Sequence, residues 1–259
     1  MSQADSTSRA INRVVDILNC FTEREPALTL TEISRRIGLA KSTTYRFVQA
    51  LESQGILSSE PNGRGIHLGY QLIHWGSLAQ ASIELRNEAL PVLRQLADRT
   101  GESAILSIRV GTAATWVEMI ESRHPVRLAM KIGQRLHLHA GASSKVLLAF
   151  LPEEELESLL PQLDLIPLEK NAITSPEELR AELGAIRERG YATSFEETDS
   201  GAMGVAAPVY DHAGQVVGGI GIAAPSTRIP PESVPGIAPL VLEASHSLSL
   251  RLGAPRRLL

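Results

Sequence analysis

Cysteine is almost absent from this sequence of 259 residues, in which Cys20 is the only example. A single cysteine excludes an intrachain disulfide and the zinc modules that need several thiolate ligands. Long apolar runs are also missing, since none approaches the ~18 residues of a membrane-spanning helix. Residues 1–13 contain no apolar core of the kind that signal peptides have. We therefore expect a cytoplasmic protein with no membrane partner.

An excess of positive charge is lacking as well, because the formal net charge of the chain is −4. The charge is unevenly distributed, however. Residues 1–75 carry eight cations and seven carboxylates, so the negative excess belongs to the remainder of the chain. Between Arg35 and Arg64, five cations stand against only Glu52 and Glu60. Such a local basic patch, rather than the total charge, decides whether a surface can contact phosphates.

Two helices are predicted near the N-terminus. Apolar residues between positions 11 and 18 repeat at the i, i+3, i+4, i+7 spacing of one helix face: Ile11, Val14, Val15 and Leu18. A second helix opens at Thr29–Glu32, whose Thr-x-x-Glu spacing is that of a capping box. Gly38 supplies the stop signal at its C-terminal end.

A third helix is predicted from Lys41 to about Gly55, and it has two distinct faces. Its inward stripe consists of Thr44, Phe47, Val48 and Leu51. The opposite face carries side chains that can donate hydrogen bonds to phosphates or base edges. Because the tight turn at 38–40 joins this helix to the preceding one, the pair is predicted to form a helix-turn-helix.

A hairpin is expected directly after the third helix. Apolar runs at 56–57 and 66–68 flank the Asn-Gly turn at 61–65, which indicates a wing. The candidates for base readout are Ser42, Thr43, Tyr45, Arg46 and Gln49. The candidates for phosphate contact are Lys41, Arg64, Arg9 and Arg13. The competing interpretation is a three-helix unit that contacts protein, in a ligand sensor rather than a DNA-binding protein.

Several stretches together resemble the IclR family of bacterial transcriptional regulators. They include LTLTEISRRIGLAKSTTYRFVQALESQGIL at 28–57, LHLHAGASSKVLLAF at 136–150 and RERGYATSFEETDSGAMGVAAPVYDHAGQVVGGIGIAAP at 187–225. The resemblance spans nearly the whole chain. It implies an α+β protein with a winged helix-turn-helix at 1–69, a linker and dimerisation helix at 70–84, and a GAF/PAS-like effector-binding domain at 85–259.

The same resemblance implies a regulator that acts as a repressor or an activator on double-stranded DNA. Two recognition helices of a homodimer, paired through the apolar linker helix, would read a pseudo-palindromic operator, and a homotetramer is a further possibility. A small-molecule effector would change operator affinity. The alternative from another class is a small-molecule enzyme with a helical docking module.

The pattern after Gly101 favours an antiparallel sheet with helices to one side. Strands are predicted at 104–110, 115–120, 126–132, 191–195, 205–210 and 215–222. Helices are predicted at 83–100, 142–151, 152–160 and 175–189, with Pro91 kinking or dividing the first of these.

Four patterns invite a catalytic or cofactor-binding interpretation, and each is weak. Gly219–Ala224 fits the GxGxxA dinucleotide fingerprint, but Pro225 follows where a helix should begin. Ser143–Lys145 lacks the SxxK spacing of Ser-Lys hydrolases. His137 and His139 have no third ligand at a fixed spacing, and Glu196 and Glu197 would point to opposite faces of a strand. We therefore expect no enzyme activity, no metal and no cofactor.

An effector cavity is better supported. Gly141, Ala142 and Ser143 open a helix whose free N–H groups favour an anion. The resemblance places the effector there, together with Ser194, Gly204, Gly221 and Ala223. Family members that bind small oxo-acids carry acidic, cysteine and serine side chains at those four positions. Here three of the four positions carry glycine or alanine in place of polar side chains, which makes the cavity larger and less polar. We therefore expect a larger, partly apolar effector such as an aromatic acid. Further walls are predicted from Trp116, Leu128, Met130 and Met203.

Overall fold

The computed structural model describes residues 3–22, 24–60, 65–81 and 84–256. The chain divides into two compact units, Met1–Ile83 and Glu84–Leu259. The predicted tip of the wing at 61–64, including Arg64, lies outside the described residues.

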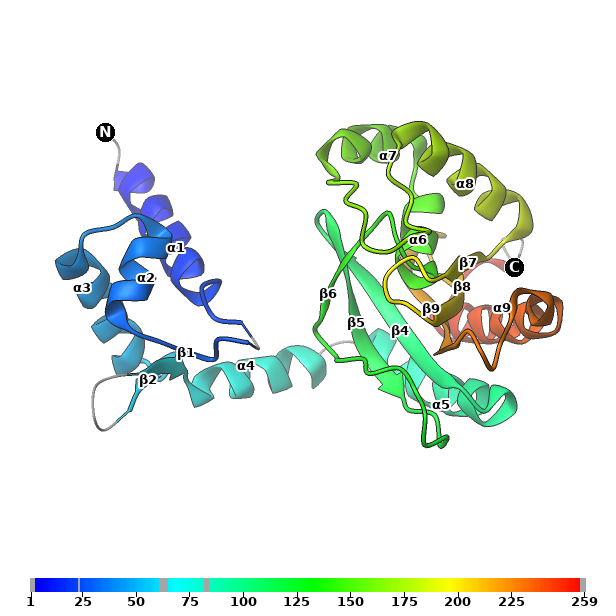
Figure 1. The fold of residues 1–259 in the computed structure, drawn as a ribbon, viewed down its shortest axis with the longest axis horizontal. Helices are drawn as coiled ribbons and strands as arrows, with labels where there is room; N and C mark the ends of the chain where they lie inside the picture. Colours follow the sequence, from blue (N-terminus) through cyan, green and yellow to red (C-terminus); the bar gives the residue numbers. More distant parts are fainter. Residues whose placement is uncertain (1–2, 23, 61–64, 82–83, 257–259) are drawn as a thin grey trace. The chain divides into compact units, whose positions relative to one another are not determined.

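The first unit consists of short helices and one small sheet (Figure 1). Its elements are α1 (Gln3–Leu18), β1 (Ala27–Leu28), α2 (Leu30–Ile37), α3 (Lys41–Ser53), β2 (Leu57–Ser59), β3 (Ile66–Leu68) and α4 (Tyr70–Ala81). The sheet is antiparallel with strand order β1-β3-β2. The helix-turn-helix and the wing hairpin are therefore confirmed. Strand β1 was not predicted, because two residues show no alternation.

Local sequence signals determine where α2 begins and ends. The Thr29 hydroxyl accepts from the Glu32 N–H at 3.3 Å, and the Thr29 N–H donates to the Glu32 carboxylate at 2.8 Å. This is the capping box, which satisfies the free N–H groups at a helix start. Gly38 ends the helix in the left-handed region at φ 66°. The Ser34 hydroxyl then donates to the Leu39 carbonyl at 2.6 Å and so fastens the turn before α3.

The core of the first unit corrects the predicted stripe on α1. Ile17 is fully buried, whereas Ile11 and Val15 are 59% and 48% exposed. The apolar residues that close this core are Leu28, Ile33, Val48, Leu51, Leu57 and Ile66. Because only one side of α1 meets α2, the helix keeps two large apolar side chains at the surface.

The second unit is built around a six-stranded antiparallel sheet. Its strands are β4 (Ser103–Val110), β5 (Ala113–Ile120), β6 (Arg135–His137), β7 (Ala192–Phe195), β8 (Ala202–Tyr210) and β9 (Val216–Pro225). They lie in the order β6-β5-β4-β9-β8-β7. Its α-helices are α5 (Glu84–Thr100), α6 (Ala142–Ala149), α7 (Glu153–Leu159), α8 (Pro176–Arg189) and α9 (Val234–Arg251). The predicted α+β class is confirmed.

Helices cover both faces of this sheet, so the prediction of helices on one side was wrong. Helices α5 and α9 pack on one face, and α6 and α8 lie on the other, as Figure 1 shows. Two separate apolar clusters result, one under each helical layer. The strands therefore bury both faces, and β8 is buried along almost its whole length.

Two further predictions in this unit need correction. Residues 126–132 form no strand; Val126 is 69% exposed there, and the edge strand is β6 instead. Pro91 does not divide α5, which continues to Thr100. The carbonyl that loses its helical donor to Pro91 belongs to the exposed Asn87, where water can replace the missing N–H.

The glycines of the GxGxxA pattern lie inside strand β9 and open no helix. The dinucleotide interpretation therefore fails. Gly221 is opposite Ala206 of β8, and a methyl group at Gly221 would lie 2.2 Å from the Val205 carbonyl oxygen. Glycine is required here because the neighbouring backbone approaches so closely.

We expect Gly221→Ala to lower the free energy of unfolding by at least about 2 kcal/mol, because the added methyl group must displace strand β8. The matched control is Gly236→Ala, since Gly236 is an exposed helical glycine with nothing within 4 Å of the added methyl. That control should stabilise the protein by up to ~1 kcal/mol. Urea unfolding of both variants checks the contrast, and a Gly221→Ala protein as stable as wild type would contradict it.

Candidate functional sites

Helix α3 separates its residues into the two predicted faces. Thr44, Val48 and Leu51 are buried, and the remaining candidates on this helix are exposed: Lys41, Ser42, Thr43, Tyr45, Arg46 and Gln49. The Gln49 amide donates to the Tyr45 hydroxyl at 2.6 Å, which holds the two side chains together on the outer face. This face presents hydroxyl, amide and cationic donors in one row.

The cations of the first unit differ in their partners. Arg36 is paired with Glu25 at 2.6 Å and donates to the Cys20 carbonyl, so it serves the fold. Arg13 lies 3.2 Å from Asp16. Neither Lys41 nor Arg46 has an ion-pair partner in the described part of the chain. Arg9 is exposed on α1.

Helix α4 presents large apolar side chains that its own unit does not cover. Tyr70 is 85% exposed, Ile73 65% and Trp75 47%. Together with Ile11 and Val15 of α1, they leave the first unit with much apolar surface for so small a domain. Several large apolar side chains exposed on one short helix make α4 a candidate interaction surface.

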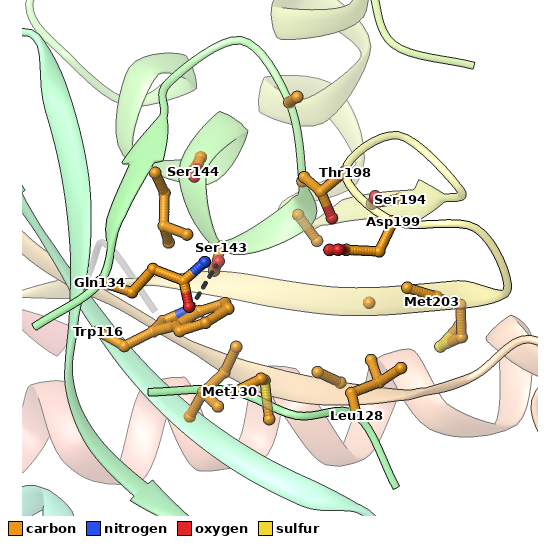
Figure 2. Close-up of a pocket in the computed structure, with 18 of the residues that line it drawn as sticks. Trp116, Leu128, Met130, Gln134, Ser143, Ser144, Ser194, Thr198, Asp199 and Met203 are labelled. Carbon is orange, nitrogen blue, oxygen red and sulfur yellow. Dashed lines mark hydrogen bonds between the residues drawn. The ribbon is translucent and has the colours of Figure 1, made fainter. Parts of the chain in front are cut away.

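The second unit contains a pocket at the start of α6, with a volume of about 330 Å³. This is within the range of small-molecule sites. Ten of the eleven predicted effector residues line it: Trp116, Leu128, Met130, Gly141, Ala142, Ser143, Ser194, Met203, Gly204 and Ala223. Figure 2 shows the Trp116 ring beside Ser143, with Met130 and Leu128 along one side and Met203 toward one end.

Gly221 is the exception among the predicted residues, since it is not part of the pocket lining. Its place opposite Ala206, with the Val205 carbonyl against it, gives it a role in strand packing. The neighbouring Ile222 and Ala223 are part of the pocket lining instead.

Several lining residues were missed by the sequence analysis. The polar ones among them that lie outside α6 come from the edge strand and from loops: Gln134, Arg135, His137, Thr198 and Asp199. Figure 2 shows Thr198 and Asp199 on one side of Ser143 and Gln134 on the other. No periodic pattern marks such residues, because their common location depends on where the loops cross the sheet.

The first turn of α6 is held from several sides. The Gly141 N–H donates to the Glu197 carboxylate at 2.8 Å, and the Trp116 indole N–H donates to the Ser143 hydroxyl at 3.3 Å. The Ser143 carbonyl accepts from Ser107 at 2.9 Å. The N–H groups of Ala142 and Ser143 remain without an acceptor among the residues described here. Two free N–H groups beside hydroxyls form an anion-binding arrangement.

A buried ion-pair network lies next to this turn. Lys145 of α6 is 2% exposed, and its Nζ contacts Glu197 at 2.6 Å and Glu182 at 3.1 Å. Burial raises the pKa of Glu197, while the Lys145 ammonium and the Gly141 N–H oppose that increase. Glu196 points elsewhere and pairs with Lys170. The two adjacent carboxylates thus have different partners, but both residues follow strand β7 (Ala192–Phe195), so the prediction that they point to opposite faces of a strand does not apply to them.

The two histidines near the pocket have different environments. His137 is exposed at the pocket, whereas His139 is 1% exposed and its Nε2–H donates to the Ile166 carbonyl at 3.0 Å. Their rings are 5.6 Å apart. Within the described ranges, no three histidine, cysteine or acidic side chains are grouped as metal ligands would be.

Two models of one family match most of the chain. Residues 10–61 match the IclR helix-turn-helix domain, and residues 78–250 match the C-terminal domain of the bacterial transcriptional regulator IclR. The chain belongs to the IclR family. The resemblance inferred from the sequence is thereby confirmed.

Relatives of this IclR-family chain match it over nearly its full length. The HTH-type transcriptional regulator KipR of Bacillus subtilis (strain 168) is 33% identical over 246 residues, covering 95% of this chain and 98% of KipR. XynR of Escherichia coli (strain K12), also an HTH-type transcriptional regulator, is 32% identical and covers 95% of this chain and 98% of XynR.

Solved structures of the family have the same architecture. An IclR-type regulator from Alicyclobacillus acidocaldarius is 29% identical with a TM-score of 0.80, covering 96% of this chain and 99% of that one. An IclR homologue from Microbacterium hydrocarbonoxydans, in complex with 4-hydroxybenzoate, is 26% identical with a TM-score of 0.79, covering 94% and 98%.

The protein is thus a transcriptional regulator with an N-terminal DNA-binding helix-turn-helix and a C-terminal ligand-binding domain. The enzyme and protein-docking alternatives are not favoured, since the relatives are named as transcriptional regulators. Of the helices in the described ranges, none has the length and apolar character needed to span a bilayer.

Burial of His139 makes the stability of this unit depend on pH. Burial is the main cause that lowers the pKa of His139 below its ordinary value of 6.5. As the pH falls through 6.5, the unfolded chain therefore takes up a proton that the folded protein does not. The unfolding free energy should be constant above this pH and should fall below it. His139→Gln, which keeps an N–H donor for Ile166, should show a flatter profile between pH 7.5 and 5.5 in urea unfolding; equal slopes would contradict the assignment.

Proposed function

We propose that this IclR-family regulator binds its operator as a homodimer and that an aromatic carboxylic acid is its effector. The observation that carries the effector assignment is the pocket at the start of α6. Its walls are largely apolar, while one end offers the free N–H groups of Ala142 and Ser143. Such a cavity suits a ligand with an apolar body and one anionic group.

The outer face of α3 is proposed to enter the major groove. Ser42, Thr43, Tyr45, Arg46 and Gln49 would contact base edges, and Lys41, with Arg9 and Arg13 of α1 and Arg64 of the wing, would contact phosphates. One α3 helix carries only two cations, Lys41 and Arg46. A single copy should therefore bind DNA weakly, and two copies about one turn (~34 Å) apart are needed for useful affinity.

The apolar surface of the first unit supports pairing of two chains. Tyr70, Ile73 and Trp75 of α4 are exposed in the monomer, as are Ile11 and Val15 of α1. A second copy would cover them and place two α3 helices on one operator. The 70–84 segment then acts as a linker and dimerisation helix between a DNA-binding domain at 1–69 and an effector domain at 85–259. Assembly of two such dimers would give a tetramer.

The effector is placed with its carboxylate at Ala142 and Ser143 and its ring against Trp116. Leu128, Met130 and Met203 would surround the ring, while Gly204 and Ala223 leave room for it. The 4-hydroxybenzoate bound by the Microbacterium homologue supports an aromatic acid. Binding that favours one arrangement of the paired helices changes operator affinity, and the coupling is reciprocal.

We further propose that the protein has no enzyme activity and acts in the cytoplasm, where bacterial DNA lies. The Ser143 hydroxyl accepts from the Trp116 indole rather than facing a base, and the buried Lys145 is engaged by two carboxylates. Neither group is arranged as an activated nucleophile.

Arg46→Ala should lower affinity for the gene's own upstream region by about tenfold or more, because each dimer loses two cationic donors in the groove. The control is Arg123→Ala, which removes the same charge from a side chain 92% exposed in the second unit. Mobility-shift titrations at several salt concentrations measure both effects. A salt-insensitive shift, or an unchanged affinity for Arg46→Ala, would contradict the proposed role of α3.

Benzoate or 4-hydroxybenzoate should raise the melting temperature, with stabilisation of ~2.7 kcal/mol at a hundredfold excess over Kd. Glyoxylate and pyruvate should have little effect, because they leave the apolar walls uncovered. Ala223→Val adds two methyl groups to the cavity wall and should lower the affinity for the aromatic acid by about tenfold. Stabilisation by the small acids alone, in a thermal-shift assay, would refute the effector class.

A further inference from the structure

We propose that Glu197 is a positioning residue of the effector pocket. The Glu197 carboxylate accepts a hydrogen bond from the Gly141 N–H. This bond orients the next two N–H groups, those of Ala142 and Ser143 in α6, toward the carboxylate of the effector. The inference rests on the proposed function of the same pocket.

Each carboxylate oxygen of Glu197 accepts a hydrogen bond from a different group, and we call this pair of bonds the Glu197 clamp. Its Oε1 accepts from Lys145 Nζ at 2.6 Å, and its Oε2 accepts from the Gly141 N–H at 2.8 Å. The side chain is 9% exposed, so neither bond is replaced by bulk water. Both oxygens are thus committed, one to a side chain of α6 and one to the backbone of Gly141, the residue that precedes the helix.

The clamp joins two walls of the pocket that are distant in sequence. Gly141 stands at the head of α6 with φ 86°, and a methyl group there would lie 3.3 Å from Thr198. Thr198 and Asp199, which follow Glu197, line the same cavity. Glu197 therefore sets the distance between the helix start and the 196–201 loop.

The backbone before the clamp is itself held in an unusual conformation. Glu196 has φ 50°, a left-handed value that is uncommon for a residue with a side chain. Its carboxylate pairs with Lys170, and the Ser226 hydroxyl donates to it at 3.4 Å. Contacts on both sides thus maintain the turn that delivers Glu197 to the helix start.

Lys145 makes this acceptor compatible with an anionic ligand. A buried carboxylate so close to the proposed effector carboxylate would repel it. The Lys145 ammonium neutralises Glu197, and Glu182, its second partner, is in turn paired with Arg189 at 2.9 Å. The network thus offers an acceptor to Gly141 without adding net negative charge behind the pocket.

Packing alone does not explain the ion pair. Apolar residues of similar volume often replace buried ion pairs without loss of stability. If positioning is the role, what must be kept is the acceptor for the Gly141 N–H, and the charges need only cancel. This separates a positioning role from a structural one.

Two double variants provide the test. Lys145→Met with Glu197→Gln removes both charges but keeps an oxygen acceptor for Gly141. Lys145→Met with Glu197→Met also removes both charges and has nearly the same shape, but it has no acceptor. The first measurement is the exchange rate of the Gly141 amide, by NMR on protein labelled with 15N-glycine. The second is the affinity for benzoate and for benzamide, by titration calorimetry.

The Glu197→Gln double variant should retain slow exchange at Gly141 and bind benzoate within about threefold of wild type. In the Glu197→Met double variant the Gly141 amide should exchange faster, and the affinity for benzoate should fall by about tenfold. Such a loss corresponds to one hydrogen bond to a charged group. Its affinity for benzamide should change much less. This selective loss is a readout that a general packing defect would not produce.

Equal Gly141 exchange in the two double variants would overturn the inference, and so would an equal loss of benzoate and benzamide affinity. The exchange measurement needs no ligand. If wild-type protein binds neither compound but the two variants differ in exchange, then the proposed effector class fails while Glu197 keeps its positioning role. If the Glu197→Met double variant does not fold, Lys145→Met with Glu197→Leu, which also has neither charge nor acceptor at position 197, gives the same comparison.

Discussion

The first turn of helix α6 is where the parts of the ligand-binding domain meet. Ser107 of the central strand β4, Trp116 of β5 and Glu197 of the 196–201 loop each bond to it. These bonds use some of the polar groups of the turn and leave the N–H groups of two pocket-lining residues, Ala142 and Ser143, without an acceptor among the described residues. A pocket with apolar walls and a small set of fixed donors is thereby formed, and its shape depends on both the sheet and the loop.

Charge is arranged differently in the two halves of the chain. The total is acidic, but the recognition helix carries Lys41 and Arg46 free of ion pairs with other described residues, while Arg36 is committed to the fold. In the ligand-binding domain, cations are mostly neutralised in pairs, as Lys145 is by Glu197. The small number of cations on α3 and the exposed apolar side chains of α1 and α4 are the two observations behind the proposal that two chains pair.

Much of the first unit could be predicted because its signals are local. The capping box at Thr29, the stop at Gly38 and the two faces of α3 each depend on residues within about one or two helical turns. The inward stripe on α1 was partly wrong, since Ile17 rather than Ile11 or Val15 meets the core. Periodicity shows that a helix has an apolar side, but here two sides are apolar and only packing decides which one is buried.

In the second unit the sequence by itself determined the strands and helices with strong patterns. The resemblance placed the start of α6 together with Ser194, Gly204 and Ala223, which all line the pocket. Only the tertiary structure decided that helices cover both faces of the sheet, that β6 rather than 126–132 forms the edge, and that Gly221 packs against β8. It also decided that Glu197 meets Gly141, a contact across 56 positions. The physical reason is that a repeating pattern records the environment of one element, whereas a close approach or a shared hydrogen bond depends on where two distant segments come to lie.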